Sequence, residues 1–388
     1  MSGSSDLRTH PEATPFDVTT LRDVFPITQE YAYLNNAGIG PPSTFAMERA
    51  RRVLHLQSTL GSLGSPQWQG WLASARRRAS ALIGAGEDEV CFLKNTPEGI
   101  STVASGLDWR AGDNVVVPNC EFPANVYPWM NLASRGVEVR WVPAPDGSVT
   151  LDVLARAVDA HTRVVALSWV QFLSGARVDP TAVGDLCHDR GAYLLLDAIQ
   201  GLGVYPLNVR RSGVHFVATA SHKWLLAPMG AGWLYCQREL IDRLHLTEVG
   251  QNTVEPRDSY LDYQYIPKAD ARRFEPGVPA YASIAGLDAA LELLERIGLE
   301  AVHAHIERLC THLIEGLLNQ GCEVLTPLDP SARAGIVTFR HPRRPAAELQ
   351  ETLLGRRIVV VNREGAIRVA PHCYNTVEEI DQLLGTLA

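Results

Sequence analysis

Two short apolar runs, each leading to an ionisable residue, constrain the fold of this chain most strongly. Residues 193–196 have the sequence Tyr-Leu-Leu-Leu and end at Asp197, and residues 216–219 have the sequence Phe-Val-Ala-Thr and lead to Lys223. Continuous apolar strands are typical of parallel sheets that are buried on both faces, and such sheets hold ligands at the carboxyl ends of their strands. The sequence therefore predicts an α/β fold with Asp197 and Lys223 at strand ends.

This pair of residues indicates one kind of chemistry. Lys223 follows Asp197 by 26 residues and is held between short connections, with a Pro-Met-Gly loop after it. A lysine amine forms a Schiff base with the aldehyde of pyridoxal 5'-phosphate, and a carboxylate pairs with the protonated pyridine nitrogen of that cofactor. We therefore expect Lys223 and Asp197 to be the catalytic residues of a site for this cofactor.

Longer motifs around both residues resemble the class V aminotransferase family of fold-type I pyridoxal-phosphate enzymes, which includes cysteine desulfurases, selenocysteine lyases and isopenicillin N epimerase. The motifs are Ser-His-Lys-Trp-Leu-Leu-Ala-Pro at 221–228, Asp-Ala-Ile-Gln at 197–200, Tyr-Leu-Asn-Asn-Ala-Gly at 33–38 and Ile-Arg-Val-Ala-Pro-His at 367–372. The resemblance implies a mostly parallel seven-stranded sheet with helices on both faces, a smaller α+β C-terminal domain and a homodimer.

The order of apolar and polar segments divides the chain into three parts. Residues 1–17 are polar and are expected to form a flexible arm. Residues 18–279 are expected to form the large cofactor-binding domain, with their N-terminal segment contributing to the small domain, and residues 280–388 to form that small domain. Residues 250–270 contain few periodic apolar positions and predict a long loop.

Composition limits the possible partners. The net charge is −8, from 43 acidic and 35 basic residues without a basic block, so nucleic acid and anionic membranes are unfavourable partners. Seven cysteines without a CxxC pair indicate free thiols and no metal site. Residues 1–6 show no basic segment followed by an apolar core, so no signal peptide is expected, and no run reaches the roughly 18 apolar residues that a membrane helix needs. We expect a cytoplasmic enzyme with a small amino-acid substrate.

Residues 96–99 predict a phosphate site at the start of a helix. Thr96 is expected to be the N-cap and Pro97 the first helical residue, which leaves the N–H groups of Glu98 and Gly99 open to phosphate. The resemblance implies the same role, although relatives carry a threonine where this chain has Pro97. It also implies that Ser221 and His222 lie near the phosphate.

The resemblance assigns two further cofactor neighbours, Phe122 and Gln200, and one substrate-binding residue, Phe172. Phe122 occupies the position at which a ring stacks on the pyridine, where desulfurases have a histidine, and Phe172 stands near their asparagine. Gln200 is expected to contact the phenolic oxygen or the phosphate. Phenylalanine stacks but cannot transfer a proton, so the pocket is expected to be more apolar than that of a desulfurase.

Substrate residues are expected at both ends of the chain. Arg368 lies on a short apolar strand, where an unpaired guanidinium is costly, and its fork suits an α-carboxylate. Asn36, Ala37 and Gly38 are expected to line the substrate site or to form a turn into the next helix. Val278 replaces the threonine with which relatives contact the phosphate of the partner subunit, so that contact is not expected here.

Three reactions remain open. No cysteine occurs between residues 355 and 365, where a desulfurase carries its nucleophile, so a persulfide-forming desulfurase is not expected. Transamination is the first expectation, a β-eliminating C–S lyase is the second and epimerisation is the third. A scaffold without catalysis is disfavoured because Lys223 and Asp197 are both present.

Overall fold

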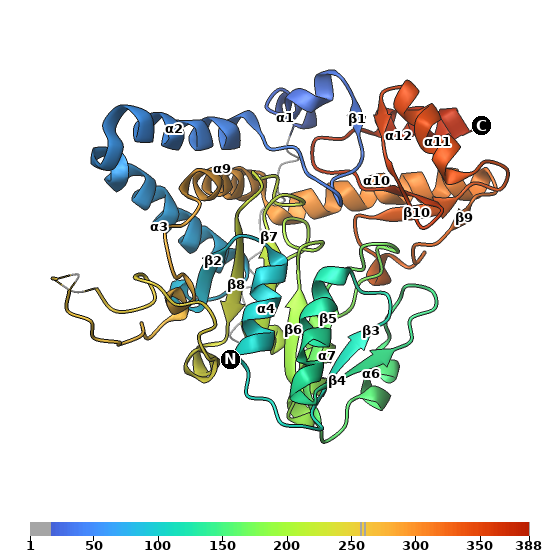
Figure 1. Cartoon of the computed structure of the whole chain (residues 1–388). Helices are drawn as coiled ribbons and strands as arrows, with labels where there is room; N and C mark the ends of the chain where they lie inside the picture. Colours follow the sequence, from blue (N-terminus) through green and yellow to red (C-terminus); the bar gives the residue numbers. More distant parts are fainter. Residues whose placement is uncertain (1–16, 257, 260, 388) are drawn as a thin grey trace, which may run out of the picture.

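The structure is a computed structural model that describes residues 17–387 except residues 257 and 260. Figure 1 shows a large sheet in the centre of the chain and a smaller sheet built from the C-terminal part. The flexible arm that the sequence predicts for residues 1–17 lies outside the described residues, apart from Asp17.

A seven-stranded sheet forms the centre of the larger part. Its order is β2 (Val90–Leu93), β8 (Gly232–Cys236), β7 (Phe216–Ala220), β6 (Tyr193–Asp197), β5 (Thr162–Ser168), β3 (Asn114–Pro118) and β4 (Glu138–Val142). β8 is antiparallel to both of its neighbours, and all other pairs are parallel. The expected mostly parallel sheet of seven strands is confirmed.

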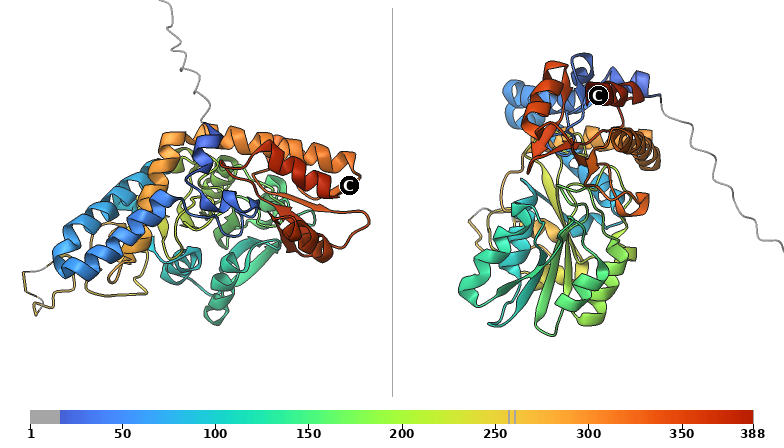
Figure 2. Two further views of the ribbon diagram at one scale, coloured as in Figure 1. Left: turned by 90° about the horizontal axis from the view of Figure 1, so that it is seen from above. Right: turned by 90° about the vertical axis from the view of Figure 1, so that its right-hand side faces the viewer.

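Helices cover both faces of this sheet because its strands are apolar on both faces. Leu194 and Leu196 of β6 belong to one buried cluster and Leu195 to another, so successive side chains enter different halves of the core. The covering helices are α4 (Thr96–Gly106), α5 (Tyr127–Met130), α6 (Leu151–Ala157), α7 (Pro180–Arg190) and α8 (Val209–Ser212). The right-hand view of Figure 2 shows α4 and α7 on opposite sides of the sheet.

The smaller sheet combines four short antiparallel strands. Its order is β12 (Val361–Arg363), β13 (Ala366–Val369), β10 (Val337–Arg340) and β9 (Glu323–Val324). Three helices surround it, namely α10 (Leu299–Asn319), α11 (Ala346–Gly355) and α12 (Val377–Leu387). The fold therefore contains the expected smaller α+β unit. The strand that carries Arg368 is one of the two inner strands of its sheet.

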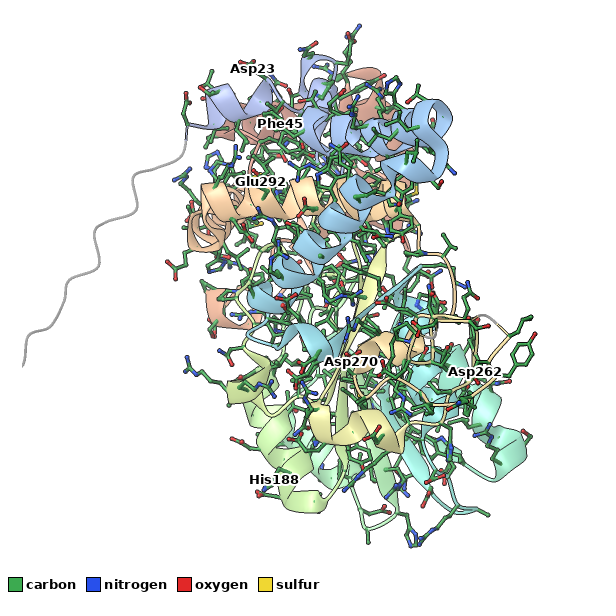
Figure 3. The ribbon with its side chains drawn as sticks, turned by 90° about the vertical axis from the view of Figure 1, so that its left-hand side faces the viewer. Asp23, Phe45, His188, Asp262, Asp270 and Glu292 are labelled. Atoms are coloured by element: carbon green, nitrogen blue, oxygen red, sulfur yellow. The ribbon has the colours of Figure 1, made fainter. Side chains whose placement is uncertain are left out.

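The N-terminal segment joins this C-terminal unit. After α1 (Val18–Arg22), β1 (Ala32–Tyr33) pairs in parallel with β11 (Ile358–Val359). The helices α2 (Thr44–Leu60) and α3 (Ser65–Leu82) then pack against α9 (Tyr281–Ile297), as Figure 3 shows for the side that carries Phe45 and Glu292. The domain boundary expected near residue 280 stays a prediction.

The described residues of the 250–270 stretch form no helix or strand, and a single bridge joins Val254 to Pro267. Within the described part of the chain, no helix combines the length and the apolar character needed to cross a membrane.

Candidate active site

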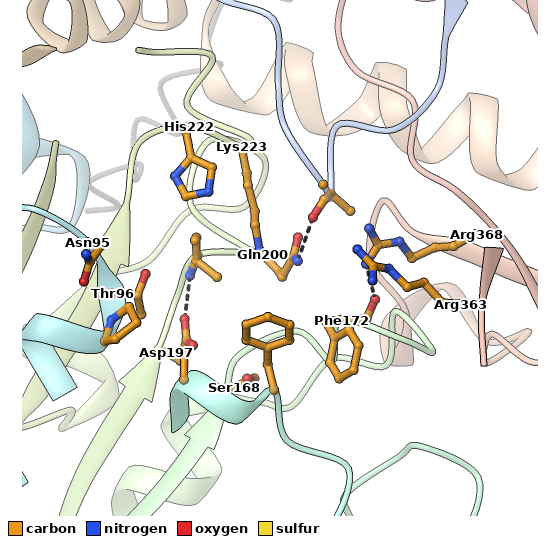
Figure 4. A pocket seen from close by; sticks show the side chains of 16 residues that line it. Asn95, Thr96, Ser168, Phe172, Asp197, Gln200, His222, Lys223, Arg363 and Arg368 are labelled. Carbon is orange, nitrogen blue, oxygen red and sulfur yellow. Dashed lines mark hydrogen bonds between the residues drawn. The ribbon is translucent and has the colours of Figure 1, made fainter. Parts of the chain in front are cut away.

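A cavity of about 370 Å³ lies at the carboxyl ends of the central strands. Segments that are far apart in sequence supply its lining, namely Ala37, Gly38, Asn95, Thr96, Pro97, Phe122, Ala124, Ser168, Phe172, Asp197, Ile199, Gln200, His222, Lys223, Arg363 and Arg368 (Figure 4). Most of these residues lie at or after the strand ends of the large sheet, whereas Arg363 and Arg368 come from the small sheet. The cavity therefore lies between the two units.

Lys223 and Asp197 enter this cavity because their strands are parallel neighbours. β6 ends at Asp197, which pairs with Ala218 of β7, and the chain continues from β7 to Lys223. Burial raises the pKa of the Asp197 carboxyl, although the backbone N–H of Ile199 donates to it over 3.0 Å. Burial lowers the pKa of the Lys223 amine, and the nearby Asp197 opposes this shift. A larger share of Lys223 is therefore a neutral nucleophile near neutral pH.

Close backbone packing fixes the turn that carries Lys223. The N–H of Gly40 donates to the carbonyl of His222 over 2.8 Å, and a Cβ at Gly40 would lie 2.0 Å from the Lys223 carbonyl oxygen. A Cβ at Gly203 would lie 2.2 Å from the Trp224 carbonyl oxygen. Leu226 has a φ of 53°, a left-handed conformation that is costly for leucine. Such packing holds the lysine in one place.

The helix start near the cavity differs from the expectation by one residue. Asn95 is the N-cap of α4, and its side chain accepts a hydrogen bond from the Glu98 N–H over 3.0 Å. The N–H of Gly99 donates to the Asn95 carbonyl. The predicted N-cap at Thr96 and the predicted open N–H groups were therefore wrong, because Asn95 satisfies both amides.

Thr96 has another feature that fits a bound phosphate. It is buried in the first turn of α4 and lines the cavity, and its hydroxyl oxygen has no hydrogen-bond partner. A buried hydroxyl without a partner costs stability unless a ligand supplies the partner. A phosphate at this end and an aldehyde at Lys223 would use both groups, so the residues present fit pyridoxal phosphate.

Two aromatic rings form one wall of the cavity. Phe122 and Phe172 pack edge to face, with their ring centroids 5.2 Å apart. Large apolar rings are usually buried, but the side chain of Phe122 is 43% exposed. Its ring therefore has surface that is free to contact a planar ligand. The geometry is compatible with the stacking role that the resemblance implies for Phe122.

Arg368 and Arg363 bring two guanidinium groups to the cavity beside Phe172 (Figure 4). Arg368 is 2% exposed on β13, where its Nη1 donates to the Phe172 carbonyl over 2.7 Å and its Nε has no partner. Burial, followed by the charge of Arg363, lowers its pKa to about 10. Arg363 lies on the adjacent strand β12 and is exposed. An anionic substrate group would complete both side chains.

Other predicted site residues have partners within the protein. Gln200 lines the cavity, but its amide donates to the Ala37 carbonyl over 3.1 Å and accepts from the Trp224 indole over 2.7 Å. Asn36 is fully buried beside the cavity lining and binds Ala370 and Tyr374.

Glu98 and Ser221 are likewise not among the lining residues. The Glu98 carboxylate accepts from the Lys94 N–H over 2.6 Å, and the Ser221 hydroxyl contacts the carbonyls of Pro228 and Ala231. Together with Asn36 they support the shape of the site, and their predicted ligand contacts stay predictions.

Five lining residues were not predicted from the sequence; two are the apolar Ala124 and Ile199, and three have polar or charged side chains. Asn95 precedes the residue chosen as N-cap, and Ser168 ends a buried strand, which is the same signal that identified Asp197. Arg363 lies in the cysteine-free interval 355–365, five residues before Arg368. A turn between two short strands could have indicated that both arginines face one site.

No thiol lines the cavity among the described residues. All seven cysteines are free, and Cys373 is fully buried, which raises the pKa of its thiol well above the usual range. A neutral, enclosed thiol is a poor nucleophile. The structure thus brings a lysine, a carboxylate and two arginines together without a nucleophilic sulfur.

Comparison with known proteins gives a consistent picture. The family model described as Aminotransferase class-V matches residues 65–383. A probable cysteine desulfurase from Methanothermobacter thermautotrophicus is 32% identical, over 94% of this chain and 95% of the relative. An uncharacterized aminotransferase, YcbU, from Bacillus subtilis is 30% identical, over 81% of this chain and 82% of the relative.

Solved structures of the cystine C–S lyase C-DES are also similar. Its complex with the reaction product cysteine persulfide has a TM-score of 0.88 and 26% identity, over 94% of this chain and 98% of that chain. A variant with glycine covalently linked to the pyridoxal-phosphate cofactor has a TM-score of 0.89 and 25% identity, with the same coverage.

Proposed function

Because this chain belongs to the aminotransferase class-V family and is a pyridoxal-phosphate-dependent enzyme, we propose that it is a lyase that cleaves the C–S bond of an amino acid such as cystine. The observation that carries the proposal is a single cavity that holds Lys223 and two arginines but, among the described residues, no thiol. A persulfide-forming desulfurase needs that thiol, whereas β-elimination does not. The similar protein C-DES is a cystine C–S lyase, which supports the same reaction class.

Four residues would hold the cofactor. Lys223 would bind its aldehyde carbon, Asp197 would keep its ring nitrogen protonated, Phe122 would cover one face of the ring, and Thr96 would donate to its phosphate. When bound, the cofactor accepts the electron pair that the substrate α-carbon releases. His222 also lines the cavity. Burial lowers the pKa of His222, and the charge of Lys223 lowers it further, so the neutral imidazole is favoured.

The remaining groups would orient the substrate and move its proton. Arg368 would bind the α-carboxylate, which places the α-carbon near Lys223. The Lys223 amine, displaced by the substrate amine, would take the α-proton. Loss of this proton and departure of the sulfur group as a thiolate or persulfide leave an unsaturated amino acid, which water converts to pyruvate and ammonia.

Arg363 supports a substrate with a second anionic group. It adds a second guanidinium to the cavity, and its charge is close enough to lower the pKa of Arg368. Two neighbouring guanidinium groups repel each other unless each has an anionic partner. Cystine carries two carboxylates and would supply both partners.

Transamination is the second candidate. It needs the same proton removal at Lys223 followed by return of a proton to the cofactor, and the similarity to YcbU favours it. Epimerisation would need a proton donor on the opposite face of the α-carbon. Phe122 and Phe172, the two aromatic rings of the described lining, carry no such donor.

Product analysis decides between these reactions. The purified enzyme loaded with pyridoxal phosphate is mixed with cystine, cysteine and alanine, and pyruvate, ammonia and sulfur products are measured over time. We expect pyruvate from cystine in multiple turnovers, and none with Lys223→Ala. Stoichiometric conversion to a keto acid that stops until another keto acid is added would instead identify a transaminase.

We also propose that the enzyme is a homodimer, as the resemblance implies, and that it is cytoplasmic, as its scattered free cysteines indicate. Light scattering after size-exclusion chromatography gives the mass in solution, and a monomer at micromolar concentration would contradict the dimer.

A further inference from the structure

Glu121 is a buried carboxylate that none of the steps above uses. It is 8% exposed and precedes Phe122, directly after the strand β3 and its connecting turn. A buried ionised carboxylate is costly unless hydrogen bonds satisfy its oxygens. The position of this carboxylate beside the cavity therefore indicates a role beyond packing.

Four hydrogen bonds converge on this carboxylate. Its Oε1 accepts from the Ser168 N–H and from the Gln171 amide, both over 2.7 Å. Its Oε2 accepts from the Ser168 hydroxyl over 2.6 Å and from the Asn125 amide over 3.1 Å. Burial raises the pKa of Glu121 and these donors oppose the rise. Because every contact is a donor to Glu121, the arrangement fits the ionised form.

These contacts connect Glu121 to Asp197. Ser168 ends β5 and is the register partner of Asp197 on β6, and the next residue, Trp169, donates its N–H to the Asp197 carbonyl over 2.9 Å. The negative charge of Glu121 also contributes, after burial, to the raised pKa of Asp197. Glu121 therefore influences Asp197 through both the backbone and its charge.

We propose that Glu121 is a positioning residue: it fixes the strand end beside Asp197 and supplies a second negative charge that keeps the proton on the cofactor ring nitrogen. This inference rests on the proposed pairing of Asp197 with that nitrogen. A proton held there is stabilised by each nearby negative charge. The other charged or titratable groups that face Asp197 across the cavity are Lys223, His222, Arg363 and Arg368, and none of them adds negative charge.

The substitution Glu121→Gln removes the charge and keeps the size. The new amide oxygen can accept from the Ser168 N–H and from Gln171, and its NH₂ can donate to the Ser168 hydroxyl. Its NH₂ would however meet the NH₂ of Asn125, whose oxygen accepts from the Trp129 indole over 3.1 Å. Two double variants resolve this conflict: Asn125→Ser adds an uncharged acceptor, and Asn125→Asp restores a negative charge close by.

The experiment measures the ring nitrogen itself. Full-length protein is loaded with pyridoxal phosphate labelled with ¹⁵N in the ring, and the ¹⁵N resonance is followed with pH in the absence of substrate. With Glu121→Gln, alone or with Asn125→Ser, the nitrogen should lose its proton at a pH lower by roughly half a unit or more. Glu121→Gln with Asn125→Asp should return toward the wild-type midpoint. Ser168→Ala, which keeps the charge and removes one hydrogen bond, should match the wild type.

Two results overturn the inference. In the first, the ring nitrogen of a folded variant without the Glu121 charge loses its proton at the wild-type pH. In the second, Ser168→Ala shifts that pH as much as Glu121→Gln does. If Glu121→Gln alone does not fold, the double variant with Asn125→Ser gives the reading. Asp197→Asn is measured in parallel, and a nitrogen that stays protonated there would refute the pairing on which the inference rests. Because no substrate is present, an incorrect choice between lyase and transaminase leaves this test valid.

Discussion

The amine of Lys223 lies over the ring of Phe122, with Nζ 5.7 Å from the ring centroid. The geometry places a stacking surface directly beside the nucleophile. A cofactor ring bound to Lys223 would therefore contact Phe122. The phenyl ring of Phe122 has no group that can exchange a proton with the substrate. Of these two side chains, only Lys223 can transfer a proton.

Replacing this ring should weaken cofactor binding. We expect Phe122→Ala to raise the Kd for pyridoxal phosphate by roughly 2- to 10-fold, which corresponds to the loss of about 0.5–1.5 kcal/mol of aromatic stacking. Phe122→Tyr keeps the ring and serves as the control. Fluorescence titration of the cofactor-free protein measures both values. Equal affinities for wild type and Phe122→Ala would show that the ring does not stack on the cofactor.

Thr96 offers a test in which stability and binding change in opposite directions. Thr96→Val removes a buried hydroxyl without a partner, so the cofactor-free protein should be as stable as wild type or more stable, by up to about 1–3 kcal/mol. Thr96→Val should bind pyridoxal phosphate at least roughly 10-fold more weakly than wild type, because a hydrogen bond to the charged phosphate is lost. Thermal unfolding and cofactor titration measure the two effects.

Thr219 is a matched control for this test. Its hydroxyl is also buried without a partner, on β7, but Thr219 does not line the cavity. Thr219→Val should therefore stabilise the protein similarly and leave the affinity for the cofactor unchanged. A similar loss of affinity in both variants would show that general packing changes, and not a phosphate contact, explain Thr96→Val.

Sequence patterns identified those parts of the structure that depend on local chemistry. The apolar run before Asp197 predicted its strand, and burial on both faces explains why the pattern was continuous. The N-cap was misplaced because Asn95 and Thr96 are both good caps, and the backbone at Asn95 decides between them. Local patterns cannot separate two adjacent candidates of this kind.

Long-range partners escaped prediction for a different reason. The Gln200 amide donates a hydrogen bond to Ala37, a residue 163 positions away. The sequence near Gln200 therefore could not show that its side chain already has a partner within the protein. The same applies to Arg363, whose orientation depends on the pairing of β12 with β13. Such contacts exist only after the N-terminal segment and the small sheet meet the large one.

The two arginines should differ in substrate selectivity. Arg368→Lys should lower kcat/KM for every amino-acid substrate by roughly 100-fold, because a lysine cannot form the paired hydrogen bonds to a carboxylate. Arg363→Gln should lower kcat/KM mainly for substrates with a second anionic group, such as cystine. Steady-state kinetics with cystine and with its monomethyl ester, which keeps one free carboxylate, would separate the two. Equal losses for both substrates with Arg363→Gln would contradict a selective role.

Catalysis should not require the cysteine nearest to Arg368 in sequence. Cys373 is fully buried and burial raises its pKa, so Cys373→Ala should keep kcat within roughly twofold of wild type. Treatment of the loaded enzyme with iodoacetamide should likewise leave activity intact. Inactivation by either change, with the fold preserved by circular dichroism, would restore the persulfide mechanism as a candidate.

Two buried histidines should make the protein less stable in mild acid. Burial lowers the pKa of His372 and of His215 to about 4. The Nδ1 of His372 accepts from the Cys373 N–H over 2.7 Å, so its Nε2 carries the hydrogen and donates to the Trp224 carbonyl over 3.0 Å. His215 similarly accepts the Leu194 N–H at Nδ1. Both rings are therefore held in the neutral form.

The sign of the effect follows from proton binding. Below the unfolded pKa of 6.5 the unfolded chain binds a proton at each histidine and the folded chain does not, so stability is lost as pH falls from 6.5 to about 4. Each group contributes up to roughly 1.4 kcal/mol per pH unit in this window. Urea unfolding of the cofactor-free protein at several pH values measures the slope. His215→Gln should reduce the slope by up to roughly 1.4 kcal/mol per pH unit; an unchanged slope in this variant would show that His215 is not held neutral.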